Sequence, residues 1–163
     1  MKRLKLSDRL ALVATRRFPA RFGAAGLPHR AVVGIGGNVG DVASRFDRVI
    51  DYMRRSGRVR VLETSPLLEN PPFGYLDQPD FLNGVILLET AMDALSLMRW
   101  LLWVEKRFGR RRTFPNAPRT LDLDIIFYDD LQKRTRRLYV PHPHYRERES
   151  VMIPLQFLEG MRR

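Results

Sequence analysis

Apolar residues recur at helical spacing in two stretches of the chain. In the first stretch they return every three or four positions, which places them on one face of a helix. These residues are Val42, Phe46, Val49 and Met53. Asp41 stands directly before them as a capping residue, and Gly57 lies just beyond their end. The pattern therefore predicts a helix between Asp41 and Gly57.

The second stretch has the same spacing. Its apolar stripe consists of Leu97, Leu101, Val104 and Phe108. Asp93 precedes the stripe as a cap, and Gly109 ends it. We expect a second helix between Asp93 and Gly109.

Four shorter segments have the patterns of strands. Two are largely apolar runs, one alternates apolar and basic side chains, and one is an apolar run that contains two acids. In chain order they are Ala31–Ile35, Arg58–Glu63, Asn83–Glu89 and Leu121–Tyr128. Thr64–Leu82 contains four prolines and is predicted to be a long loop without helix or strand.

The order of these elements predicts the fold class. Strand, helix, strand, strand, helix, strand is the order of the α+β, ferredoxin-like βαββαβ plan, an antiparallel sheet with two helices on one face. After a turn at Asp129-Asp130, Leu138–Val140 is expected to add a C-terminal edge strand. Topology alone assigns no function.

Positive charge is concentrated at the start of the chain. The 163 residues include 29 Lys and Arg against 18 Asp and Glu, a net charge of +11. Eight of the basic residues and one acid lie in residues 1–30, so residues 31–163 are only mildly basic. We expect residues 1–30 to form a basic extension, flexible or loosely docked, and residues 31–163 to form the functional domain.

Residues 1–30 also contain a weak helical signal. Ser7 could cap a short helix that carries Leu10 and Val13 on one side. The apolar stretch there is too short for a secretory signal, whereas a mitochondrial-type presequence remains open.

Composition excludes several classes of chemistry. The chain has no cysteine, which excludes disulfides, thiolate nucleophiles and cysteine-bound metals and fits a cytoplasmic location. No apolar run approaches the roughly 20 residues of a membrane span, so we expect no membrane partner.

Two acids stand close together in the last main strand. Asp122 and Asp124 are two residues apart, so their side chains point to the same face. Like charges at such a spacing call for a shared proton, basic partners or a hard cation, and magnesium with phosphate is the natural occupant. The alternative is an exposed strand face whose acids meet nearby arginines.

Basic residues adjoin this strand. Arg110, Arg111, Arg112 and Arg119 could clamp a polyphosphate, although such a run is also typical of a solvated loop. A second anion-binding strip is possible downstream, where His142 lies between Arg137 and Arg148; exposed loop histidines are the alternative.

Aromatic and amide groups near the long loop could bind a flat heterocycle. They are Phe73, Tyr75, Phe81 and Asn83. Core packing is the alternative for Phe81. The glycine-rich segment from Gly34 to Gly40 is similar to a nucleotide fingerprint but fits no such pattern fully, and a tight turn from strand to helix is the preferred interpretation.

Five ordered blocks resemble the 6-hydroxymethyl-7,8-dihydropterin pyrophosphokinase family. They span residues 36–41, 70–74, 77–83, 118–124 and 140–143, and the block Pro-Arg-Thr-Leu-Asp-Leu-Asp is the most specific. The resemblance implies that ATP donates its β and γ phosphates together to the hydroxymethyl group of the pterin, leaving AMP. It implies a pyrophosphokinase domain in residues 31–163.

The resemblance also implies roles for individual residues. Asp122 and Asp124 would hold two Mg²⁺ ions, and Arg110 and Arg119 would be catalytic as well as ATP-binding. Further ATP contacts would come from Glu105, Arg112, Arg137, His142 and Arg148. The pterin would contact Asn70, Pro71, Phe73, Phe81 and Asn83.

The chain departs from the family pattern at a few positions. Gly37 replaces a usual serine, Asn70 a usual threonine, and Asn116-Ala117 a frequent Trp-Gly pair, and Ser150 stands where a stacking aromatic is common. We expect small-molecule partners, ATP and the pterin, and a monomer or weak dimer.

Two other functions are compatible with the predicted fold. Nucleic acid is an unlikely partner, because the third predicted strand, Asn83–Glu89, lacks the basic and aromatic core of an RNA-recognition motif. A catalytically inactive regulatory domain of the same fold is the other rival.

Overall fold

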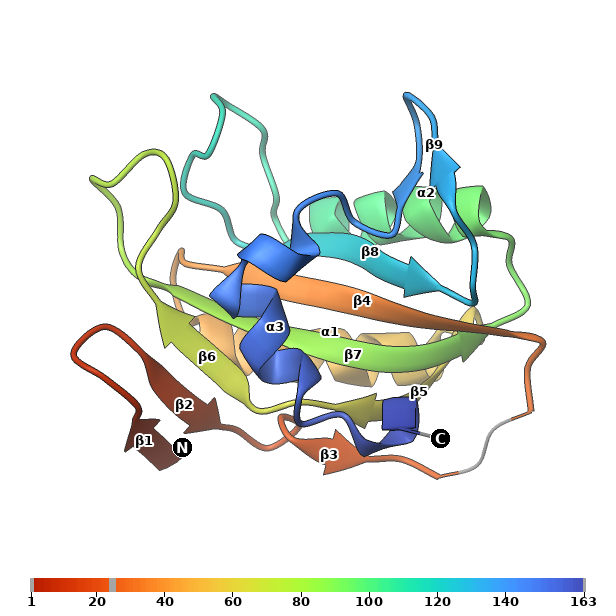
Figure 1. The fold of residues 1–163 in the computed structure, drawn as a ribbon, viewed down its shortest axis with the longest axis horizontal. Coiled ribbons are helices and arrows are strands. Elements are labelled where there is room, and N and C mark those ends of the chain that lie inside the picture. The colour runs from red at the N-terminus through yellow and green to blue at the C-terminus, as the bar shows by residue number, and fades with distance from the viewer. Residues whose placement is uncertain (1, 24–25, 163) are drawn as a thin grey trace.

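A mostly antiparallel sheet forms the centre of the computed structural model, which describes residues 2–23 and 26–162 (Figure 1). Its main strands are β4 (His29–Gly37), β5 (Val59–Thr64), β6 (Leu67–Asn70), β7 (Phe81–Thr90) and β8 (Asp122–Tyr128). β4 pairs with β7 on one side and with β8 on the other, and β5 and β6 both pair with β7. These pairings are all antiparallel, and β8 lies at an edge of the sheet because β4 is its one neighbour in the strand order of the described residues.

Two helices cover one face of the sheet, α1 (Val42–Arg55) and α2 (Ala94–Arg107). Both predicted caps are confirmed. The N–H of Ser44 donates to Asp41 at 3.3 Å, and the N–H of Ser96 donates to Asp93 at 2.8 Å. The predicted stripes lie in the main core, where Phe46, Val49 and Leu97 have no exposed surface. Periodicity thus predicted both helices and the face that each one buries.

A third helix, which was not predicted, packs on the opposite face. Figure 1 shows α3 (Glu149–Leu155) crossing this face of β4 and β7. Val151 and the nearby Leu158 form a second core cluster with Val32 and Val85. The segment carries no long apolar stripe that would reveal a helix, and Pro154 lies inside it. The expected arrangement of helices on one face is therefore incomplete.

The long loop contains a strand, so the prediction of Thr64–Leu82 as wholly irregular is wrong. Leu67–Asn70 forms β6, and Leu67 and Leu68 are both fully buried. Pro66 separates β5 from β6, but the two run in turn along the same edge of β7. The N–H of Val85 donates to the hydroxyl of Ser65 at 3.0 Å across the break. The four prolines of this segment are typical of a loop, so the sequence pattern did not indicate a strand.

Residues 2–23 contain three strands and no helix, so the expected short helix near Ser7 is wrong. β1 (Lys2–Lys5) and β2 (Ala11–Ala14) pair as a hairpin, and β2 also pairs with β6. β3 (Ala20–Arg21) pairs with β5. Residues 2–23 thereby extend the sheet beyond β5 and β6 (Figure 1).

This N-terminal segment is packed against the domain rather than loosely docked. Phe18 has no exposed surface, and its ring lies 6.1 Å from that of Phe46 in α1. Asp47 of α1 accepts hydrogen bonds from the Thr15 hydroxyl at 2.7 Å and the Arg17 N–H at 2.9 Å. Burial of a Phe side chain supplies stability that a flexible tail would lack. The division of the chain at residue 30 stays a prediction.

The C-terminal edge strand is also corrected. Tyr139–Val140 forms β10, but its partner is β9 (Lys133–Arg134) in a separate two-stranded sheet. Two short 3₁₀ turns, Tyr145–Glu147 and Glu159–Arg162, flank α3. In the described part of the chain, no helix is long and apolar enough to cross a membrane.

Candidate active site

Asp122 and Asp124 lie over a part of the sheet that has little side-chain bulk. In the pairing of β8 with β4, Asp122 is opposite Gly36 and Asp124 is opposite Gly34. Both acids belong to the face that carries α3, because Ile126 on the same side of β8 packs in the α3 cluster. The structure thus confirms that the two acids share a face.

Both acids line one cleft with the basic loop. The cleft has a volume of about 250 Å³, and the segment Arg110–Arg119 supplies most of its wall. In Figure 1 this loop rises from the end of α2 next to the loop that follows β6. The predicted proximity of the acids to the arginines is confirmed.

Two arginines pair with Asp122. Arg110 Nη1 lies 3.5 Å from Oδ1 of Asp122, and Arg119 Nη1 lies 3.4 Å from Oδ2. Backbone acceptors fix both groups, since Arg110 donates to the Leu121 carbonyl at 2.9 Å and Arg119 to the Ala117 carbonyl at 3.0 Å. The buried Nε of Arg110 has no hydrogen-bond partner within the protein. An incoming oxygen ligand could satisfy this donor.

The environment of Asp124 disfavours its negative charge. The residue is exposed and lines the cleft. The surrounding protein and then the carboxylates of Asp122 and Glu105 raise the pKa of Asp124 to about 7, against the opposing charges of Arg148 and Arg110. A cation placed between the two acids would offset this repulsion.

Glu105 holds the strand between the two acids. Its side chain is 2% exposed, and its Oε2 accepts the N–H of Leu123 at 2.7 Å. Because β8 is an edge strand, this amide has no strand partner on its outer side. Oε1 of Glu105 pairs with Arg112 at 3.0 Å. Burial raises the pKa of Glu105, and the charge of Asp122 adds to the effect.

A second pocket adjoins the first on the other side of Asp124. Its volume is about 290 Å³, and its walls are mainly apolar. They include Leu101, Leu123, Ile125 and Val140, with Glu105, Arg112 and His142 as polar members. An apolar slot with a few polar groups suits a flat ring.

His142 is held in one orientation at this pocket. Its backbone N–H donates to the Ile126 carbonyl at 3.0 Å, and its Nδ1 lies 3.3 Å from the N–H of His144, where it acts as the acceptor. Burial and the charges of Arg148 and His144 lower the pKa of His142. When the ring is neutral, its proton lies on Nε2, because Nδ1 accepts the N–H of His144, and Nε2 can then donate to a ligand oxygen.

Three of the predicted pterin residues lie on two paired strands, Asn70 on β6 and Phe81 and Asn83 on β7. Pro71 and Phe73 belong to the loop that follows β6. Asn83 Nδ2 donates to Asn70 Oδ1 at 2.7 Å. The Cβ of any residue larger than glycine at Gly36 would lie 2.4 Å from Asn83 Oδ1, so the glycine leaves room for this amide. The Asn70 amide in turn donates to the Pro71 carbonyl at 3.0 Å.

Arginines face the two predicted aromatic rings. The guanidinium carbon of Arg119 lies 4.9 Å from the ring centre of Phe81, and that of Arg148 lies 5.8 Å from Phe73. Phe81 is buried, whereas Phe73 is 54% exposed. The arginines predicted to bind phosphate thus contact the aromatic rings predicted to bind the pterin.

Arg137 is not brought to the cleft. It is exposed between β9 and β10 and lines neither of the two pockets described above. Its predicted ATP contact stays a prediction.

The sequence analysis did not predict a role for Asn38 and Gln78. These residues connect the loop that follows β6 with the basic loop Arg110–Arg119. Asn38 is 5% exposed, and its Nδ2 donates to Gln78 Oε1 and to the Pro79 carbonyl, both at 2.9 Å. Gln78 Nε2 donates to the Asn116 carbonyl at 2.9 Å. Tyr75 and Phe114 meet edge to face at 5.2 Å between ring centres. Both polar residues lie inside the family blocks, which was the available signal.

The donor set fits Mg²⁺ together with phosphate. Within the described residues, no group of three or more acidic, histidine or cysteine side chains could hold a metal by itself. Mg²⁺ commonly binds to one or two carboxylates and completes its shell with water and substrate phosphates. Asp122 and Asp124 match that requirement.

Comparison with known proteins gives one family. Residues 32–160 match 7,8-dihydro-6-hydroxymethylpterin-pyrophosphokinase (HPPK). The chain is 43% identical over 125 residues to 2-amino-4-hydroxy-6-hydroxymethyldihydropteridine pyrophosphokinase of Campylobacter jejuni, covering 77% of this chain and 80% of the relative. The identically named Helicobacter pylori protein is 35% identical over 147 residues, which cover 88% and 90% of the two chains. The chain belongs to the 7,8-dihydro-6-hydroxymethylpterin-pyrophosphokinase family.

Proposed function

We propose that this protein transfers pyrophosphate from ATP to the hydroxymethyl group of 6-hydroxymethyl-7,8-dihydropterin, a step of folate biosynthesis. The pterin oxygen attacks the β-phosphorus in line, the bond to the bridging oxygen of AMP breaks, and the hydroxyl proton is released. The observation that carries this proposal is the pair of acids on β8, set in one cleft with Arg110 and Arg119 and beside the Asn70–Asn83 amide pair.

Asp122 and Asp124 would hold the Mg²⁺ ions, of which two are expected. When bound, Mg²⁺ neutralises charge on the phosphates and polarises the attacking hydroxyl. The raised pKa of Asp124 supports this assignment, because burial and the neighbouring carboxylates disfavour a negative charge that a cation would stabilise.

The remaining chemistry is positioning and charge neutralisation. Arg110 and Arg119 are fixed by backbone carbonyls, so their free N–H groups can meet the transferred phosphates without reorganising. His142 Nε2 and Arg148 would contact further phosphate oxygens. Arg112 would join them from the basic loop, where Glu105 holds it.

The two pockets suit the two substrates. The apolar pocket beside Glu105 and His142 would receive the adenine base. The pterin would pair its polar edge with Asn70 and Asn83, stack against Phe81 and Phe73, and contact the backbone at Pro71.

The strand and helix order also supports a ferredoxin-like plan for β4, α1, β5, β7, α2 and β8. A cytoplasmic location and a monomeric or weakly dimeric state stay predictions.

The test is AMP formation from ATP, Mg²⁺ and the reduced pterin. Wild-type protein should produce one AMP for each pterin diphosphate. Asp122→Ala and Asp124→Ala should abolish turnover while circular dichroism shows a folded chain, and Asp8→Asn in the exposed β1–β2 turn is the control. Turnover retained in both acid variants would refute the metal assignment, and no turnover by wild type would refute the function.

Arg119→Ala separates catalysis from binding. The single-turnover rate should fall far more than the affinity for pterin, because the guanidinium acts on phosphate charge that develops during transfer. An unchanged rate would remove Arg119 from the catalytic group.

A further inference from the structure

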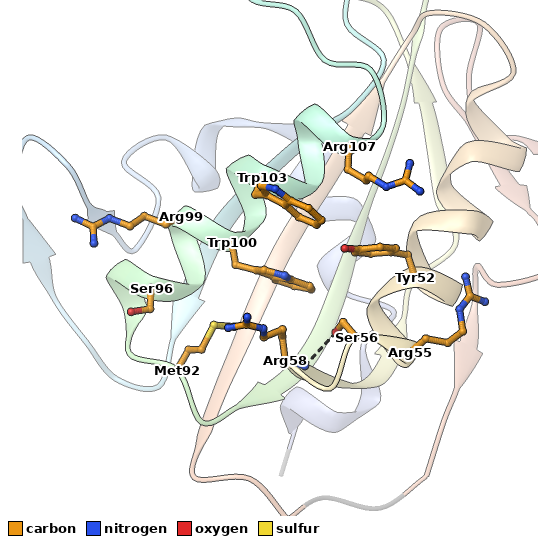
Figure 2. Close-up of a pocket in the computed structure, with 10 residues that line it drawn as sticks. All are labelled: Tyr52, Arg55, Ser56, Arg58, Met92, Ser96, Arg99, Trp100, Trp103 and Arg107. Atoms are coloured by element: carbon orange, nitrogen blue, oxygen red, sulfur yellow. Dashed lines mark hydrogen bonds between the residues drawn. The ribbon is translucent and has the colours of Figure 1, made fainter.

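A large pocket lies on the face of the sheet that α1 and α2 cover (Figure 2). Asp122 and Asp124 belong to the opposite face, which carries α3. Its volume is about 860 Å³, within the range of about 300–1,000 Å³ typical of small-molecule sites. It opens between α1 and α2. The residues that line it are Tyr52, Arg55, Ser56, Arg58, Met92, Ser96, Arg99, Trp100, Trp103 and Arg107.

Three aromatic side chains form the inner surface. Figure 2 shows Trp100 and Trp103 of α2 pointing toward Tyr52 of α1. The Tyr52 and Trp103 rings lie 6.0 Å apart at an interplanar angle of 34°. The ring of Tyr52 also packs edge to face against that of Phe108, with 5.8 Å between the ring centres, so Tyr52 has a role in packing. Trp103, in contrast, is 51% exposed. An indole this open provides a stacking surface that the fold itself does not use.

The pocket is also strongly basic. Four of its lining residues are arginines and none is acidic. Among residues 2–23 and 26–162, no ion pair involves any of these four arginines, whereas Arg110 and Arg119 of the candidate active site pair with Asp122. Arg58 and Arg107 lie on opposite sides of the ring cluster in Figure 2, and Arg99 points away from it. Unpaired guanidinium groups beside open rings favour an anion that carries an aromatic ring.

We propose that this pocket is a second binding site, for a flat aromatic heterocycle that carries a phosphate or diphosphate group. The ring stacks on Trp103 beside Tyr52, and the phosphate pairs with Arg58 or Arg107. Two sources have this chemistry, a nucleotide such as AMP and a phosphorylated pterin. The site does not depend on the proposed activity, because its residues lie outside the catalytic cleft and binding is measured directly.

Tryptophan fluorescence reports directly on this pocket. The chain has two tryptophans, and both line the pocket. Titration of the full-length protein with AMP, without Mg²⁺, should give saturable quenching, whereas inorganic phosphate should not. The double variant Arg58→Gln, Arg107→Gln should weaken AMP binding about tenfold or more, because each charge-assisted bond contributes on that order. Arg9→Gln, an exposed arginine in the distant β1–β2 turn, should leave binding unchanged.

Further arms exclude other origins of the signal. Asp122→Ala should keep the quenching, and the double arginine variant should keep wild-type turnover. Calorimetry with 6-hydroxymethylpterin diphosphate, on wild type and the double variant, shows which of the two sources binds more tightly.

Four outcomes would overturn the proposal. They are the absence of saturable quenching, equal quenching by inorganic phosphate, quenching lost in Asp122→Ala but kept in the double variant, and much tighter binding of a single-stranded oligonucleotide than of AMP. The last would mark the face as a nucleic-acid surface.

Discussion

Asn38 and Arg119 exchange hydrogen bonds through their backbones and one side chain. The N–H of Asn38 donates to the Arg119 carbonyl at 2.9 Å, and the N–H of Arg119 donates to Asn38 Oδ1 at 3.0 Å. The same side chain reaches Gln78 and Pro79. One buried amide at the end of β4 therefore sets the position of both loops around the cleft.

Asn38→Ala should impair both stability and catalysis. It leaves the Arg119 N–H and the Pro79 carbonyl without a partner, so the free energy of unfolding should fall by about 1–3 kcal/mol. The single-turnover rate should fall as well, because Arg119 loses its fixed position. Denaturant unfolding and rapid-quench kinetics measure these effects, with Asp8→Asn as the control. A rate equal to that of the wild type would show that the loops are positioned without Asn38.

Glu105 offers a matched pair of variants. Glu105→Gln keeps an oxygen for the Leu123 N–H, and since burial already raises the pKa of Glu105, loss of the charge should cost little stability. Glu105→Ala leaves that amide unpaired and a cavity beside it, which should cost about 2–4 kcal/mol. Activity should follow the same order, because Leu123 lies between the two acids. Equal losses in the two variants would contradict a role as acceptor.

Phe18→Ala tests whether the N-terminal segment is part of the folded domain. Removal of this fully buried ring should lower the free energy of unfolding by about 3–5 kcal/mol. Leu4→Ala, at a side chain that is 61% exposed, should change it by less than about 0.5 kcal/mol. Chemical denaturation of both variants provides the comparison. Similar small effects would restore the view of a loosely docked extension.

The ion pairs of Asp51 predict a dependence on pH. A hydrogen bond from Arg16, opposed by partial burial and aided by the charge of Arg17, lowers the pKa of Asp51 below its ordinary value of 3.8. The ionised carboxylate therefore stabilises the fold fully above the ordinary pKa of 3.8. This contribution is lost as the pH falls through the lowered pKa. Asp51→Asn should melt at a lower temperature than wild type at pH 7, and the gap should close below about pH 4.

Thermal melts of both proteins across this pH range measure the gap. A gap that stays constant under acid conditions would show that the charge of Asp51 does not hold the N-terminal segment to α1.

Local patterns predicted the elements that depend on neighbours in sequence. The stripes and caps of α1 and α2 arise from contacts three or four residues apart, and the spacing of Asp122 and Asp124 fixes their common face. Thr64–Leu82 shows the limit of this reasoning. Its prolines predict a loop, but the burial of Leu67 and Leu68 against β7 stabilises a strand there.

Local sequence patterns were enough to predict the central strands, two helices, the shared face of Asp122 and Asp124, and the family. The tertiary structure alone decided that residues 2–23 join the sheet, that α3 covers part of its second face, and that Asn38 ties the loops together. It also places Arg137 outside the cleft and the adjoining pocket. Between α1 and α2, it brings two tryptophans together with four arginines. The physical reason is that strand pairing and side-chain convergence depend on contacts between segments far apart in the chain, and no local period encodes them.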